Sequence, residues 1–244
     1  MSRPKLYRLM TLAAALFATP AYAHQIWLEQ DGDKAVLYFG EFHENLREVS
    51  PGLLDRIEPK AQVVSAKGDR AIDTAKGAGA FALATGAAVG ESLLVEDTHF
   101  AILERKTGDK ITRTARTMGA RHALDFEARE PKLALDIVPA GKPGAFKVFF
   151  KGKPLAKAKV EVIAASGWTR EVRTDAQGAI DVTLPWQGRY VVEVEHTDPT
   201  AGERAGAPYD MASYVSTLSF VTRDGVASPP PPPAATPHKL SATP

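Results

Sequence analysis

The chain has 244 residues, of which 44% are hydrophobic and 24% are charged, a composition typical of a globular protein with a substantial core. Its formal net charge is only +1, which argues against a nucleic-acid-binding protein, since such a protein needs a strongly basic face. Cysteine is absent, which excludes disulfides and thiolate metal ligands. The fold must therefore be stabilised by packing, with a bound metal as the remaining source of cross-linking.

The first 23 residues have the three parts of an export signal. Basic residues within 3–8 precede an apolar run over 9–18, and Ala21 and Ala23 form an A-x-A cleavage site. The apolar run is too short to span a bilayer, so we expect cleavage after Ala23 and no transmembrane segment in the mature protein. A periplasmic location is predicted, with secretion as the alternative. The mature chain would start at His24 and carry 27 basic and 29 acidic residues, a formal net charge of −2.

From His24 to about residue 130 the pattern is mostly β. Short segments with apolar residues on one face, separated by turn residues, predict strands over 24–29, 35–39, 61–66, 80–84, 92–95, 100–103 and 111–118. A helical turn is expected within 46–57. Strong helical periodicity is missing elsewhere, so we predict a β-sandwich-like domain over 24–130 rather than an α/β fold.

The second half, residues 131–225, alternates more regularly between apolar and polar residues. Tyr190, Val192 and Val194 are one example, and turns rich in Gly, Pro and Asp separate the alternating segments. About six or seven short strands at such spacing predict an antiparallel sandwich. The fold class expected from the sequence is therefore all-β, with two consecutive antiparallel β-sandwich-like domains.

Three short motifs in this half carry a family resemblance. The segments 152–160, 174–178 and 184–190 have the patterns G-x-P-L-x-x-A-x-V, T-D-x-x-G and a strand that starts at G-x-Y. Together they resemble the carboxypeptidase-regulatory-like, or transthyretin-like, sandwich. The turn over 174–178 suits this scaffold, because Asp175 can bond back to the turn and Gly178 can adopt a positive φ. The resemblance implies a scaffold and no particular activity.

Residues 226–244 form a proline-rich tail that contains an unbroken proline run over 229–233. Such a segment favours extended polyproline geometry and has no apolar pattern to bury, so we predict a disordered tail. His238 lies in this tail. The sequence therefore gives no reason to place His238 in a folded site.

The chain from residue 24 to 222 has a second, wider resemblance. It begins with His-x-x-Trp-Leu over 24–28, passes through Glu195-His196, and ends with Thr-Leu-Ser-Phe over 217–220. This arrangement is similar to an uncharacterised periplasmic family described as the periplasmic component of nickel or cobalt uptake systems. The resemblance implies a metal ion as ligand and a membrane metal-uptake system as partner.

Four histidines are candidate metal ligands. His24 would offer both its ring and its new α-amino group, and His196 is its natural partner because it ends a strand and precedes a polar loop. His43 and His99 are lesser candidates with nearby carboxylates, and they are equally well explained as a solvated loop residue and as part of an acidic turn, respectively. His122 lies in a basic stretch, which disfavours a bound cation.

These ligand types set the expected chemistry. Amine and imidazole nitrogens suit nickel, cobalt, copper and zinc, and copper(II) binds them most tightly. We therefore predict a carrier or accessory protein for a divalent transition metal, nickel, cobalt or copper. The alternative is a structural or protein-interaction β-sandwich module without a metal.

An enzyme is not expected, because the sequence has no G-x-S-x-G and no H-E-x-x-H motif. A weaker alternative is a copper-dependent redox enzyme, because an N-terminal histidine brace is the ligand set of lytic polysaccharide monooxygenases.

Overall fold

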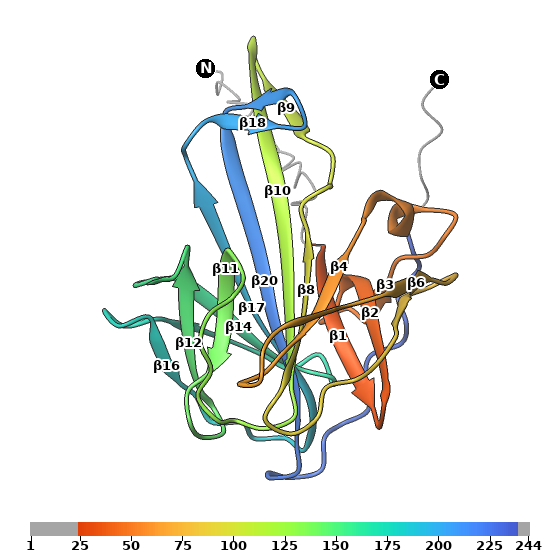
Figure 1. Ribbon diagram of the computed structural model, residues 1–244, viewed down its shortest axis with the longest axis vertical. Helices are drawn as coiled ribbons and strands as arrows, with labels where there is room; N and C mark the ends of the chain where they lie inside the picture. Colours follow the sequence, from red (N-terminus) through yellow and green to blue (C-terminus); the bar gives the residue numbers. More distant parts are fainter. Residues whose placement is uncertain (1–23, 239–244) are drawn as a thin grey trace, which may run out of the picture.

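A computed structural model describes residues 24–238 of the protein (Figure 1), so the expected export signal over 1–23 and the last residues, 239–244, lie outside the described residues. The all-β fold class expected from the sequence is confirmed. Three main sheets and one small hairpin make up the structure, and the helical turn expected within 46–57 is the 3-10 helix η1 (Leu53–Arg56). In the described part, no helix is long and apolar enough to cross a membrane.

The N-terminal sheet has the strand order β1-β2-β7-β6, with β3 paired to the end of β2. Its strands are β1 (Gln25–Asp31), β2 (Lys34–Glu41), β3 (Leu46–Arg47), β6 (Thr74–Lys76) and β7 (Phe81–Leu83). Gly32 forms the β1–β2 turn with a φ of +55°, a conformation that glycine adopts without steric cost.

The central sheet has nine strands in the order β15-β14-β17-β20-β10-β8-β4-β5, with β9 paired to β10. Its strands are β4 (Lys60–Val64), β5 (Arg70–Ile72), β8 (Ser92–Asp97), β9 (Leu103–Thr107), β10 (Lys110–Ala123), β14 (Lys159–Ala164), β15 (Thr169–Arg173), β17 (Gly188–Asp198) and β20 (Met211–Thr222). The two long strands β10 and β20 pair in parallel along the middle of this sheet (Figure 1).

The third sheet consists of β11 (Leu135–Pro139), β12 (Ala145–Phe150), β13 (Lys153–Pro154) and β16 (Ala179–Asp181). It packs on the opposite face of the central sheet from the N-terminal sheet (Figure 1). A separate hairpin, β18 (Gly202–Arg204) with β19 (Ala207–Tyr209), occupies the stretch that the sequence predicted as a long polar loop.

Two large hydrophobic cores and one small cluster around Trp27 fill the spaces between the three layers. The first large core contains residues from Ile26 to Ala120 and the second contains residues from Ala123 to Phe220, whereas the small cluster joins residues of both halves of the chain. In addition, β10 from the first half and β20 from the second half are neighbours in one sheet. The two sandwiches therefore share the central sheet, whereas the sequence suggested two domains that follow one another.

The proline-rich tail also differs from the expectation of disorder. Its described part, residues 226–238, has no regular secondary structure but contacts the folded body at several points. Val226 forms backbone hydrogen bonds with Pro185 and Gln187, and further along the tail Ala235 N donates to Asn45 O. Sequence composition missed this path because these contacts are hydrogen bonds of the tail backbone, which need no pattern of apolar side chains.

A buried ion pair joins the central sheet to the third sheet. The Arg121 guanidinium donates to both oxygens of Asp136 at 3.0 and 2.6 Å, and both side chains are almost fully buried. Asp136 also accepts backbone N–H groups from Lys132 and Leu133. These partners compensate the desolvation of the carboxylate.

We expect Asp136→Ala to lower the free energy of unfolding by about 3–5 kcal/mol, because it leaves the Arg121 charge buried without a partner. Asp181→Ala is the matched control, since the Asp181–Lys142 pair is exposed and such pairs contribute about 1 kcal/mol or less. Urea unfolding of both variants measures the difference. Equal losses in the two variants would contradict this role for the buried pair.

His122 is a buried histidine within β10. Its Nδ1 lies 3.1 Å from Ser219 Oγ, and its Nε2 has no partner among the described residues. Burial, together with the positive charge of Arg189, lowers the pKa of His122 from 6.5 to about 4. The ring is therefore neutral in the folded protein at neutral pH.

The pKa of His122 is lower in the folded state than in the unfolded state. Its contribution to the free energy of unfolding is therefore fully present above about pH 6.5 and is lost as the pH falls towards 4. We expect wild-type protein to lose up to about 3 kcal/mol more than His122→Gln between these pH values. Urea unfolding at several pH values gives the comparison. Parallel pH profiles for the two proteins would show that His122 does not carry the acid sensitivity.

Candidate metal site

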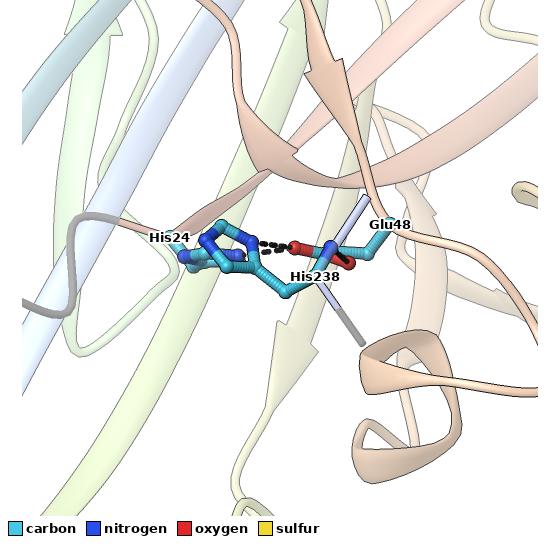
Figure 2. Close-up of side chains that lie close together, drawn as sticks. All are labelled: His24, Glu48 and His238. Atoms are coloured by element: carbon cyan, nitrogen blue, oxygen red, sulfur yellow. Dashed lines mark hydrogen bonds and ion pairs between the residues drawn. The ribbon is translucent and has the colours of Figure 1, made fainter. Parts of the chain in front are cut away.

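Three polar side chains from distant parts of the sequence meet beside the start of β1. His24 directly precedes β1, Glu48 directly follows β3, and His238 lies at the end of the described tail (Figure 2). His24 Nε2 and His238 Nδ1 both lie 2.6 Å from the same oxygen, Oε1, of Glu48. Potential ligand atoms of the three residues all lie within 4.8 Å of one another.

Glu48 is the buried centre of this group, with no exposed surface. A buried carboxylate is costly unless it accepts hydrogen bonds, and the two rings and the His238 backbone N–H, 3.1 Å from Oε2, are suited to donate them. Glu48 is held in place by its own backbone N–H, which donates to Phe39 O at 2.8 Å. Gly40 permits this close approach of β3, because a Cβ there would lie 2.2 Å from Leu46 O.

The position of His24 is fixed by three neighbours. The Arg116 guanidinium donates to the His24 carbonyl oxygen at 2.5 Å, and the Phe39 ring packs with its centroid 5.2 Å from the imidazole centroid. On the other side of the ring, Nδ1 lies 3.3 Å from Glu41 Oε1. The two ring nitrogens of His24 therefore face two different carboxylates.

This orientation bears on the expected use of the α-amino group. The amine and the ring of one histidine chelate a metal through Nδ1, because Nδ1 is close enough to the backbone to close a small ring. In the structure Nδ1 faces Glu41, whereas Nε2 faces Glu48 and His238. The group around Glu48 therefore includes the Nε2 atom of His24 but does not use the α-amino group of His24.

The tail places His238 through contacts that precede it in the sequence. Asn45 Nδ2 donates to Pro232 O at 2.9 Å, and Asn45 O accepts from Ala235 N at 3.3 Å. Asn45 itself has a φ of +52° in the loop between β2 and β3. Proline-rich chain is stiff and extended, so anchoring it at Asn45 directs the following residues towards Glu48.

The structure does not bring His196 to His24. His196 lies within β17 rather than at its end, and its ring packs on Phe150 with 4.3 Å between centroids. Its main-chain neighbour across the sheet is Tyr214. Burial lowers the pKa of His196, with the Lys151 charge acting in the same direction. The arrangement is that of a packing residue at the rim of the second core.

The two lesser candidates also lie apart from Glu48. His43 is in the loop between β2 and β3 and forms a partly exposed group with Glu41 and Glu44, with 3.5 Å between His43 Nε2 and Glu44 Oε1. His99 is exposed after β8, and its backbone N–H donates to Asp97.

Sequence reasoning missed His238 and did not single out Glu48. Nothing in the composition of the tail marks His238, since the surrounding residues have no periodic pattern. A signal for Glu48 was available in principle, because it is a charged residue that follows a short strand next to a predicted turn. Such residues are common at exposed positions, however, so burial of Glu48 needed the structure to reveal it.

A family model matches residues 21–198 of the chain, from just before His24 to the end of β17. Its description is "Domain of unknown function (DUF4198)". The chain belongs to this family. Comparison with curated proteins and comparison with solved structures both gave no match. The DUF4198 match includes His24 and Glu48, and it ends before β20 and the tail that carries His238.

The tail contacts give a prediction that does not depend on a metal. Removing residues 226–244 takes two groups away from the buried Glu48 carboxylate, so the free energy of unfolding in chelator should fall by about 1–3 kcal/mol. His238→Ala in the full chain should cause part of this loss, and His99→Ala, at an exposed position, should cause none. Chemical unfolding of the three variants tests this. A truncated chain as stable as the full chain would contradict tail docking at Glu48.

Proposed function

We propose that the protein is an exported carrier or accessory protein for a divalent transition metal, nickel, cobalt or copper. The proposed ligands are His24 Nε2, His238 Nδ1 and a carboxylate oxygen of Glu48. The observation that carries the proposal is that two imidazole nitrogens from opposite ends of the chain lie 2.6 Å from one oxygen of a fully buried carboxylate.

The donor set supports a transition metal. Two imidazoles and one carboxylate suit nickel, cobalt, copper and zinc, whereas calcium and magnesium prefer oxygen ligands throughout. Bonds from such metals to these donors are about 2.0–2.2 Å long. Small movements of the two rings would therefore make room for a metal ion in place of the protons that hydrogen-bond to Glu48. The charge of the metal would then balance the negative charge of the buried carboxylate.

The mobility expected of a carrier's ligand also supports the proposal. A carrier has to release its metal, and one of the three proposed ligands lies on a segment with no regular secondary structure. Withdrawal of the tail would remove His238 and leave two ligands. The proposed partner is a membrane metal-uptake system that accepts the ion at this stage.

Metal titration of a chain that starts at His24 tests the proposal. By calorimetry we expect about one equivalent of nickel, cobalt or copper per chain. His24→Ala, Glu48→Gln and His238→Ala should each weaken binding by at least about 10-fold, because each removes a ligand. His99→Ala and His196→Ala are matched controls and should bind as the unaltered protein does.

Two results would contradict the proposal. Absence of metal uptake by the correctly started chain would favour a structural or protein-interaction module, in which the three residues only fasten the tail. Copper-dependent turnover of oxygen or peroxide that needs the His24 amine and ring, and not His238, would instead indicate a copper redox enzyme with an N-terminal histidine brace.

A further inference from the structure

The start of β1 lies over two glutamates of the central sheet. Towards the other end of β1, Glu29 pairs with Arg189 of β17, with 2.8 Å between Arg189 Nη1 and Glu29 Oε2. Two residues earlier, Trp27 packs in one cluster with Val191. Alternate residues of a strand share a face. Gln25, two residues before Trp27, is therefore at the level of Glu193, two residues after Val191.

A second contact gives the same alignment. Thr217 Oγ1, on β20, donates to Ile26 O at 2.7 Å, and Thr217 is the cross-strand partner of Glu193. Cross-strand partners project from the same face of a sheet, so Glu193 faces β1 beside Ile26. Glu195 is one step further along the same face of β17. The backbone nitrogen of His24 therefore lies at the level of Glu193 and Glu195.

These two carboxylates have no ion-pair partner within residues 24–238. The nearby Arg116 guanidinium donates to the His24 carbonyl oxygen instead. Burial, followed by the charges of Glu195 and Glu161, raises the pKa of Glu193 to about 8, and the charge of Arg116 acts in the opposite direction. The described residues therefore supply too little positive charge to keep the Glu193 carboxylate ionised at neutral pH.

The neighbouring Gln25 gives an independent indication that a polar group is missing. Its side chain is only 1% exposed, yet neither its amide nitrogen nor its amide oxygen has a hydrogen-bond partner. Gln25 shares the face of β1 that Trp27 presents to β17, so its amide points towards the level of Glu193. A buried polar group without a partner costs about 1–3 kcal/mol, and a hydrogen-bond donor bound between Gln25 and Glu193 would remove this cost for the amide oxygen.

We propose that Glu193, together with Glu195, binds the α-ammonium group of a chain that starts at His24. The ligand class is a primary ammonium, supplied by the protein itself. This inference rests on one part of the proposed function, the start of the mature chain at His24, and does not depend on metal binding. Glu193 would act as a positioning residue that fixes the first residue, so that the His24 ring reaches Glu48.

A double-mutant cycle in metal-free buffer with chelator tests the proposal. The first change extends the chain so that it starts at Ala21, which moves the ammonium away by three residues, and the second change is Glu193→Gln. In the unaltered background the extension should raise the unfolding equilibrium constant about 10-fold, the effect of losing one charged hydrogen bond. In the Glu193→Gln background the extension should change it less than about 2-fold.

Glu161→Gln is the matched control, because Glu161 lies on the same face and is paired with Lys159, with 2.9 Å between Lys159 Nζ and Glu161 Oε1. With this control the extension should keep its full effect. The proposal would be overturned if the extension had the same effect with Glu193 as with Gln at this position. It would also be overturned if the extension lost its effect in the Glu161→Gln variant. Because no metal is present, these outcomes are independent of the metal titration.

Discussion

The parallel pairing of β10 with β20 is the constraint on which the rest of the structure depends. It joins the two halves of the chain into one nine-stranded sheet and places one sandwich on each face of that sheet. It also positions the site, because Arg116 on β10 and Thr217 on β20 both donate to carbonyl oxygens at the start of β1. His24 is therefore located by a sheet whose strands come from both halves.

The candidate site joins the two ends of the described part of the chain. Its first described residue, His24, and its last, His238, meet at Glu48, whose burial excludes water from the carboxylate. A buried carboxylate with histidine donors stabilises the attachment of the tail, and the same atoms are the donors that a transition metal prefers. Tail docking and the proposed metal binding would therefore use one group of atoms, and release of the metal would be coupled to movement of the tail.

The sequence predicted those features that depend on local alternation. Tyr190, Val192 and Val194 do face one core, and β1, β2 and β8 lie close to their predicted positions. The pairing of β10 with β20 could not be predicted, since about ninety residues separate these strands and no local pattern specifies a partner. The position of His238 could not be predicted either, because it depends on backbone contacts of the tail with Asn45.

The metal proposal rests on geometry and not on family membership. The DUF4198 match covers His24 and Glu48 and carries no assigned activity, so the chemistry rests on the three converging side chains. A crystal structure of the chain starting at His24, grown with nickel or copper and measured at the absorption edge of the metal, tests this most directly. We predict one anomalous peak bonded to His24 Nε2, His238 Nδ1 and Glu48. A peak at Glu41 and His24 Nδ1, or no peak near His24, would contradict it.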